Sequence, residues 1–243
     1  MHGAANQVAE ICRRNTLLAA LPAASLAALL PHAEVATLPR RQVLAEEGET
    51  LHHALFPLDG VVSLASAMED GAQSETGMIG REGLVGAEAV LDGPGALGCY
   101  VVQIPVEALR LPFARLAAAA AENPALRSLL LRFVEAFLAQ TLRLVACNGR
   151  HAVEPRCCRW LLMAHDRARG DAFGLTQEFL AEMLSVRRAS AGAVCRRLER
   201  RGIIRLGRGR IEVVDRRGLE TASCECHAAI RRAFDRLLPG SFA

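Results

Sequence analysis

The segment 175–202, LTQEFLAEMLSVRRASAGAVCRRLERRG, constrains the fold more than any other part of the chain. It contains two short helical patterns joined by a tight turn at Ser185-Val186. Thr176 can cap the first helix because its hydroxyl can accept a hydrogen bond from an otherwise unpaired backbone N–H. Gly202 is a suitable stop for the second helix. Apolar residues recur at helical spacing on one face of each helix, namely Leu180, Met183 and Leu184, then Ala191, Val194 and Leu198.

The opposite face of the second helix is rich in arginine, with Arg188, Ser190, Arg196 and Arg200. Residues 184–210 contain nine arginines and one acid, Glu199, which gives a net charge of +8. A helix surface that is only solvated usually interleaves acids with its basic residues to limit repulsion. The pattern therefore favours a helix-turn-helix that binds a polyanion, with the second helix placed in the major groove of DNA.

A predicted β-hairpin follows this segment. Residues 203–206 and 211–214 are short β-like runs, separated by the turn Gly207-Arg208-Gly209-Arg210. The hairpin would complete a winged helix-turn-helix. Arg208 and Arg210 at its tip are expected to contact DNA phosphates and to position the protein without reading bases.

The two halves of the chain differ in charge. Residues 1–150 hold 11 arginines and 15 acids, a net charge of −4, whereas residues 151–243 hold 18 arginines and 11 acids, a net charge of +7. The second half is therefore the expected partner of a polyanion. No Gly-x-Ser-x-Gly, P-loop, His-x-x-x-His or dinucleotide fingerprint occurs, so the sequence gives no support for an enzyme.

The first half is β-like from about Val35 to Ile104. Short apolar runs alternate with turn signals at roughly ten-residue spacing, namely Glu47-Gly48, Asp59-Gly60, Asp70-Gly71 and Asp92-Gly93. This spacing predicts an antiparallel, cupin-like β-roll.

A long helix is predicted to begin at Asn123-Pro124, where a capping residue precedes a proline, and to run to about Asn148. It carries two apolar stripes, so one could pack on the roll while the other meets a partner helix; the alternative is that both are buried within one chain. We favour a homodimer, because a helix-turn-helix normally needs two copies to read a two-fold site. The stripe assigned to the dimer interface comprises Leu126, Leu130, Phe133, Phe137, Thr141 and Leu144.

The predicted organisation is α+β. A sensor roll with leading helical turns occupies residues 1–122, the dimerisation helix 123–148, a hinge 149–155, and the winged helix-turn-helix domain 156–243. A helix at 156–168 carrying Trp160 is expected to cap the core of the last domain. The apolar run 17–30 resembles a signal peptide but is interrupted by Pro22 and is too short for a membrane span. Eight cysteines without a regular spacing indicate reduced thiols, so we expect a cytoplasmic protein.

With both halves in view, the chain resembles CRP/FNR-type transcription regulators over nearly its full length. The resemblance rests on LPRRQVLAEEGETLHHALFPLDGVVSL in the roll, on the long helix, and most specifically on LTQEFLAEMLSVRRASAGAVCRRLERRGII. It implies a sensor roll derived from a cyclic-nucleotide pocket, a dimerising helix and a domain that binds promoter DNA.

Departures from the family pattern bear on the effector. The stretch that corresponds to the phosphate cassette places Gly86, Glu88 and Ala89 in the expected effector pocket, with Glu88 displaced by one position. No arginine occurs from Glu82 to Leu109, and a buried phosphate without a cationic partner is costly. Cyclic nucleotide is therefore not the expected ligand. The effector stays unidentified.

The resemblance also assigns the recognition residues. Arg188 keeps the family position and is expected to contact guanine O6 and N7, while Ser190 can reach a base edge or a phosphate. Arg187 and Arg196 are expected to hold phosphates, with Thr176 beside them. Ala193 replaces a family arginine, so the target sequence should differ from the commonly described sites.

No cofactor is expected. Cys12 alone cannot hold an N-terminal iron–sulfur cluster, and His52 and His53 are interpreted as surface residues rather than haem ligands. Cys224-Glu225-Cys226-His227 is the one local cluster with metal-ligand chemistry, but it supplies at most three ligands in awkward geometry, so we predict no metal. Cys157 and Cys158 are expected to pack in the core.

The predicted partners are double-stranded DNA, a second copy of the chain, RNA polymerase and an unidentified small molecule, with no membrane. Two alternatives remain open. The first is a small-molecule-binding module that acts on a protein partner through its basic half. The second is a thiol- or metal-responsive regulator that uses Cys224 and Cys226.

Overall fold

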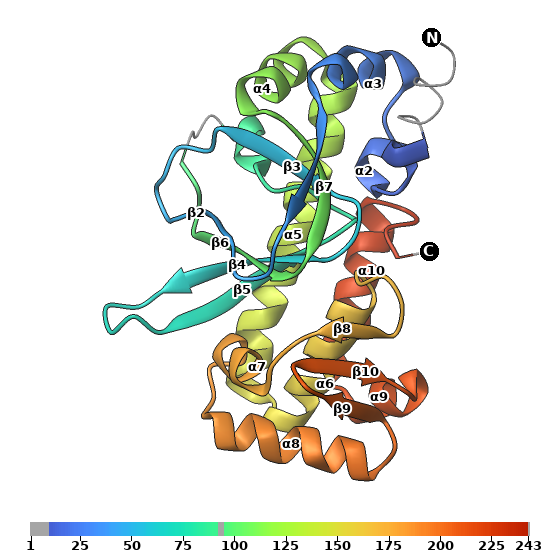
Figure 1. The fold of residues 1–243 in the computed structure, drawn as a ribbon. Helices are drawn as coiled ribbons and strands as arrows, with labels where there is room; N and C mark the ends of the chain where they lie inside the picture. The colour runs from blue at the N-terminus through green and yellow to red at the C-terminus, as the bar shows by residue number, and fades with distance from the viewer. Residues whose placement is uncertain (1–9, 92–94, 243) are drawn as a thin grey trace.

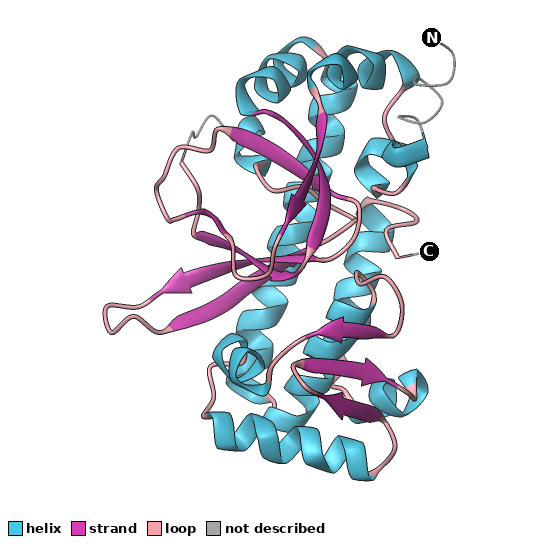
Figure 2. Ribbon diagram, viewed as in Figure 1, coloured by secondary structure: helices cyan, strands magenta, loops and turns pink. Residues whose placement is uncertain are grey.

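A computed structural model describes residues 10–91 and 95–242. One long helix, α5 (Pro124–Arg150), runs along the molecule, with a β-roll packed on its first part and a mixed helical and β domain at its far end (Figure 1). Strands gather in the roll and in a separate small sheet of the C-terminal domain (Figure 2). This is the α+β architecture that the sequence predicts.

Two antiparallel sheets form the roll, in the orders β1-β7-β3 and β2-β6-β4-β5. Positive φ angles at Gly48, Gly60 and Gly71 confirm three of the predicted turns; the fourth, Asp92-Gly93, lies outside the described residues. Gly60 is also required sterically, since a Cβ there would lie 2.2 Å from the carbonyl oxygen of Pro105. The elements of this half are α2 (Thr16–Ala19), α3 (Ala23–Leu29), η1 (Leu30–His32), β1 (Glu34–Leu38), β2 (Val43–Ala45), β3 (His53–Pro57), β4 (Val61–Ala67), β5 (Gln73–Ile79), η2 (Ala87–Val90), β6 (Cys99–Ile104), β7 (Val106–Pro112) and α4 (Phe113–Glu122).

Helix α5 begins where the sequence predicts. The Asn123 side chain accepts hydrogen bonds from the backbone N–H groups of Ala125 and Leu126, at 3.0 and 3.1 Å, and Pro124 occupies the first helical position. With 27 residues the helix is about 40 Å long, at about 1.5 Å per residue.

The stripe assigned from the sequence to the dimer interface is wrong, because this face of α5 packs on the roll of its own chain. Two roll glycines make room for its rings: a Cβ on Gly77 would lie 2.2 Å from Phe137, and one on Gly83 would lie 2.3 Å from Phe133. Of the six residues named, four are buried and two are partly buried; they are Leu126, Leu130, Phe133 and Leu144, then Phe137 and Thr141.

A different face of α5 is exposed. Leu131, Leu138, Leu142 and Val145, here called the exposed stripe, have exposed fractions of 40 to 66% and account for four of the ten large exposed hydrophobic residues of the described chain. Leu138, Leu142 and Val145 belong to the second apolar stripe of the predicted helix. Their spacing of seven, four and three residues forms one seam along the helix.

The hinge is shorter than the predicted 149–155. Helix α5 continues to Arg150, and helix α6 (Val153–His165) begins three residues later, so His151 and Ala152 alone separate the two. The sequence predicts that α6 starts at residue 156, because Pro155 suggests a linker. Proline is, however, well tolerated in the first turn of a helix, and α6 starts at Val153.

The C-terminal domain contains the predicted helix-turn-helix and wing. Its sheet has the order β8-β10-β9, in which β8 was not predicted because three residues are too short to show a strand pattern. None of the described helices combines the length and apolar composition needed to cross a membrane. The remaining elements are β8 (Ala172–Gly174), α7 (Gln177–Met183), α8 (Arg188–Arg200), β9 (Ile204–Gly207), β10 (Arg210–Val213), α9 (Arg216–Ala222) and α10 (Cys226–Leu237).

Buried polar contacts join the two halves. The guanidinium of Arg167, which follows α6, lies 2.8 Å from the carboxylate of Glu82 in the roll, with side-chain exposures of 1% and 0%. The Arg167 side chain also donates to the side-chain oxygen of Gln140 on α5, at 3.3 Å. Trp160 donates its indole N–H to Glu75 of β5 at 3.2 Å. Trp160 is therefore buried at the junction between the halves as well as in the core of its own domain.

Candidate nucleic-acid interface

The helix-turn-helix has the cap, the turn and the helix end that its sequence predicts. The Thr176 hydroxyl accepts a hydrogen bond from the backbone N–H of Phe179 at 3.2 Å, which caps α7 as predicted. The turn places Ser185 at a φ of +52°, and Gly202 ends the second helix at +71°. The apolar residues predicted to join the helices, Leu180, Met183, Leu184, Ala191, Val194 and Leu198, are all buried.

Helix α8 lies at the outer edge of the molecule, at the end remote from α3 and α4 (Figure 1). Its predicted outer residues Arg188, Ser190, Arg196 and Arg200 are exposed, and so is Arg187 at its N-cap. A helix of 13 residues is about 20 Å long, enough to present its first turns to the floor of one major groove.

Ion pairing separates the nine arginines of 184–210 into two groups. Arg197 and Arg201 both pair with Glu154, at 2.8 and 3.1 Å, and Arg205 pairs with Glu212 at 2.8 Å. The other six make no ion pair within the described residues; they are Arg187, Arg188, Arg196, Arg200, Arg208 and Arg210. All five arginines proposed from the sequence as DNA contacts belong to the second group.

The wing brings two predicted contacts close to the recognition helix. Strands β9 and β10 pair with Arg210 opposite Gly207, leaving Arg208 and Gly209 as a two-residue turn. A surface hollow of about 190 Å³ is lined by Thr176, Arg188 and Arg210 together, although these residues come from three separate elements. Gln177 lines the same hollow and was missed in the sequence, where only its position next to Thr176 could have indicated it.

The predicted effector pocket is nearly closed. Glu88 is buried, accepts a hydrogen bond from the Tyr100 hydroxyl at 2.7 Å, and keeps its second oxygen without a hydrogen-bond partner among the described residues. Burial and the neighbouring Glu88 carboxylate raise the pKa of Tyr100, so its hydroxyl stays a neutral donor. The adjoining cavity has a volume of about 40 Å³ and is bounded by Phe133 and Phe137. Gly86 is buried with a φ of +100°, and Ala89 is partly buried.

A much larger open cleft lies between the roll and the C-terminal domain. Its volume is about 1130 Å³, and Arg14 and Asp59 line it from the first half. Asp166 lies on its C-terminal wall and accepts hydrogen bonds from Arg216 and Arg231 at 2.6 and 3.1 Å. Many of the arginines in this cleft are therefore neutralised by acids of the chain.

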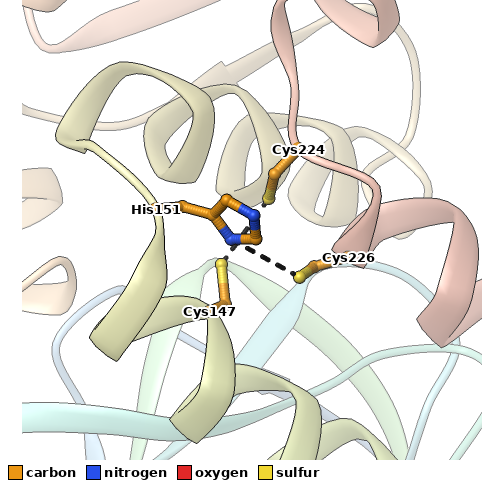
Figure 3. Close-up of side chains that lie close together, drawn as sticks. All are labelled: Cys147, His151, Cys224 and Cys226. Atoms are coloured by element: carbon orange, nitrogen blue, oxygen red, sulfur yellow. Dashed lines mark hydrogen bonds between the residues drawn. The ribbon is translucent and has the colours of Figure 1, made fainter.

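The cysteine cluster differs from the expectation based on its sequence. His227 does not join Cys224 and Cys226, because its ring nitrogen lies 2.8 Å from the carboxylate of Asp166. Two residues at the end of α5, Cys147 and His151, meet the pair instead (Figure 3). The four ligand atoms all lie within 4.8 Å of one another, so the argument that ruled out a metal here for lack of a fourth ligand was wrong.

This fourfold group was missed because its halves are more than 70 residues apart in sequence. A spacing of four residues places Cys147 and His151 on one face of a helix, so the two are recognisable as a possible pair of metal ligands. Nothing in the sequence connects this pair with Cys224 and Cys226. Cys157 and Cys158 are buried in the core, as the sequence predicts.

The fold and the exposed basic surface define a winged helix-turn-helix protein with an N-terminal β-roll. Comparisons with known proteins agree with this class. Residues 155–222 match the family described as "Crp-like helix-turn-helix domain". A comparison with curated protein sequences gives no match.

Several solved structures share the architecture. FixK2 from Bradyrhizobium japonicum has a TM-score of 0.67 at 17% identity, over 79% of this chain and 98% of that one. TTHB099, a CRP-family transcriptional regulator from Thermus thermophilus, has a TM-score of 0.64 at 18% identity, over 77% and 96% of the two chains. The c-di-GMP-responsive regulator CLP of Xanthomonas campestris has a TM-score of 0.62 at 17% identity, over 79% of this chain and 99% of that one.

Residues 155–222 therefore form a Crp-like helix-turn-helix domain. Over 77–79% of its length the chain shares the fold of the first two of these solved structures.

Proposed function

We propose that the protein is a homodimeric transcription regulator that binds a two-fold DNA site through α8 and the wing. The observation that carries this proposal is the set of six exposed arginines on α8 and the wing tip that make no ion pair within the described residues. Unpaired guanidinium groups on one surface would repel each other, and a polyanion relieves that repulsion while releasing its counterions.

We assign the DNA contacts of α8 and the wing from the positions of their exposed residues. Arg188, in the first turn of α8, is placed to reach base edges, where a two-pronged contact with guanine discriminates by about 1–3 kcal/mol. Ser190 lies beside it on the exposed face. We assign Arg187 and Arg196 to phosphates beside the groove, and Arg208 and Arg210 to phosphates under the wing.

The experiment is selection of bound sequences from a random duplex pool, followed by binding measurements on the selected site. Arg188→Ala should weaken the selected site about 5- to 150-fold and relax the preference at one base pair, the equivalent of about 1–3 kcal/mol. Arg208→Ala should weaken selected and random duplexes by the same factor. Arg197→Ala is the matched control, because Arg197 lies on the same helix but pairs with Glu154.

An equal loss of affinity for all sequences with Arg188→Ala would show that Arg188 is not a reading residue. No selected motif at all, together with a flat dependence of affinity on salt, would contradict DNA binding, since each neutralised phosphate contributes about −0.9 to the log–log slope. Such a result would favour the alternative in which the basic surface contacts a protein.

Dimerisation is the second part of the proposal, and its interface is assigned to the exposed stripe of α5. Leu131, Leu138, Leu142 and Val145 form an apolar seam that water otherwise covers. Packing it against the same seam of a second copy would bring two α8 helices onto one duplex, about one helical turn or 34 Å apart. RNA polymerase as a further partner, and action in the cytoplasm, are predictions that rest on this role.

A response to a small molecule acting in the roll is the third part. A cavity of about 40 Å³ beside Glu88 is too small for a nucleotide, and the neighbouring stretch from Glu82 to Leu109 contains no arginine. Any ligand there must displace Phe133 or Phe137 from the roll, which would move α5 and shift the population of binding-competent dimers. Calorimetric titration should show no binding of cyclic AMP, while tight binding of it would contradict the assignment of this pocket.

A further inference from the structure

Four side chains with metal-ligand chemistry converge where the end of α5 meets the start of α10. Cys147 and His151 are one turn apart on α5 and its C-cap, while Cys224 and Cys226 precede and begin α10 (Figure 3). Because the sulfurs of Cys147 and Cys224 are 77 residues apart in sequence, the convergence of the two pairs depends on the tertiary fold.

Two of the separations match those around one tetrahedral ion, and all four ligand atoms lie within 4.8 Å of one another. With zinc–sulfur bonds of about 2.3 Å and zinc–nitrogen bonds of about 2.0–2.1 Å, tetrahedral angles place two sulfurs about 3.8 Å apart and a sulfur and a nitrogen about 3.6 Å apart. The sulfurs of Cys147 and Cys224 are 3.6 Å apart, and the Cys226 sulfur lies 3.8 Å from Nδ1 of His151. Neither separation is that of a disulfide, whose sulfurs are about 2.05 Å apart.

The surroundings are also those of a metal site. All three cysteines are buried, and they form a small core cluster of their own. The far ring nitrogen of His151, Nε2, lies 3.2 Å from the carboxylate of Glu225, the contact that commonly fixes the orientation of a metal-bound histidine.

We propose that Cys147, His151, Cys224 and Cys226 bind a single Zn²⁺ ion as a closed tetrahedral site. Three thiolates and one imidazole form a ligand set typical of structural zinc, and four ligands from the protein leave no position for a substrate. Convergence within 4.8 Å suits one ion better than an iron–sulfur cluster, whose ligands bind different irons. Binding replaces the thiol protons, which are released to solvent.

The site ties the C-terminal helix to the end of the long helix beside the two-residue hinge. Helix α10 lies alongside α5 (Figure 1), and a metal between their ends would fix the angle at which α6 leaves His151 and Ala152. Loss of the ion, by chelation or thiol oxidation, would free that angle. Zinc binding itself does not depend on the proposed DNA-binding function, and it is measured without DNA.

The test is metal analysis of the untagged, reduced full-length protein by mass spectrometry. We expect one zinc per chain, and less than a tenth of that in the double variant Cys224→Ser, Cys226→Ser. His151→Ala should weaken zinc binding at least tenfold. Two matched controls should keep one zinc per chain: Cys12→Ser, a buried cysteine elsewhere, and His227→Asn, which neighbours Cys226 but pairs with Asp166.

Cobalt titration of the zinc-stripped wild type keeps the test independent of whether a variant folds. Tetrahedral d–d bands with thiolate-to-cobalt charge transfer, saturating at one Co²⁺ per chain, would support the site. Absence of both zinc and these bands in the reduced protein would overturn the proposal, as would full zinc occupancy in the double variant. Iron with acid-labile sulfide in place of zinc would overturn the assignment to a single ion, and loss of zinc in His227→Asn with retention in His151→Ala would overturn the ligand set.

Discussion

Replacing Glu82 with glutamine should destabilise the junction between the roll and the C-terminal domain by about 3 kcal/mol. The substitution keeps the shape of the side chain but removes its charge, which leaves the guanidinium of Arg167 buried without a counter-ion. Removing one partner of a buried ion pair typically costs about 3–5 kcal/mol. The Glu82 and Arg167 side chains are almost fully buried and 2.8 Å apart, so we expect a cost within this range.

The lower end of that range applies because Arg167 keeps other partners. Its guanidinium still donates to the carbonyl of Met163 at 2.9 Å and lies over the ring of Phe242 at 5.1 Å. In a protein of this size about 1 kcal/mol shifts the melting temperature by roughly 2–4 °C, so a fall of about 6–12 °C is expected.

Urea unfolding followed by tryptophan fluorescence is a suitable assay, because the chain has one tryptophan and Trp160 lies in this junction. Arg167→Met should cost a similar amount, and the double variant should cost at least about 2 kcal/mol less than the sum of the single changes. Additive effects, or a cost below about 1 kcal/mol for Glu82→Gln, would refute the account of a coupled buried pair.

Three further outcomes follow from the described contacts. Although burial raises it, hydrogen bonds and charge from His227 and Arg216 lower the pKa of Asp166 from 3.8 to about 2. The stability this gives, about 2 kcal/mol, is present above pH about 4 and is lost as the pH falls towards 2, so Asp166→Asn should flatten the acid limb of a stability–pH curve. Leu142→Asp should raise the dimer dissociation constant at least tenfold in sedimentation experiments, whereas Val35→Asp, an equally apolar exposed position on β1, should not. Gly77→Val should cost about 1–3 kcal/mol in urea unfolding, because its side chain would overlap the ring of Phe137; a neutral effect would mean that α5 is free to move on the roll.

Local patterns in the sequence predicted the helix-turn-helix well, because each signal acts within a few residues. The Thr176 cap, the apolar faces of both helices and the Gly202 stop are all decided by spacing and backbone conformation. The exposed arginines were recognisable for the same reason. The pairing of Arg197 and Arg201 with Glu154 was not, because Glu154 lies 43 and 47 residues away in sequence.

The features that the sequence did not reveal depend on long-range packing. Both stripes of α5 are apolar, and the close packing of Phe133 and Phe137 on the roll glycines Gly83 and Gly77 is visible only in the folded chain. The start of α6 at Val153 and the strand β8 depend on neighbours as well. Cys147 and His151 lie far in sequence from Cys224, so no local spacing could unite them.

The two sides of the C-terminal domain are held to the roll with unequal strength. At the helix-turn-helix, the hydroxyl of Ser185 meets that of Ser74 on β5 at 2.9 Å in an exposed position, a contact worth about 1 kcal/mol at most. Arg167, by contrast, is anchored inside the roll. A rotation that lifts the helix-turn-helix would also break the buried contact of Met183 with Gln103 and the contact of Arg41 with the ring of Phe179, all of them between neutral or exposed groups on at least one side. Withdrawal of the whole domain would in addition expose a buried charge. A tilt of the C-terminal domain that keeps the Arg167–Glu82 pair must turn about a point near Arg167, so the domain can change its angle to the roll without withdrawing from it.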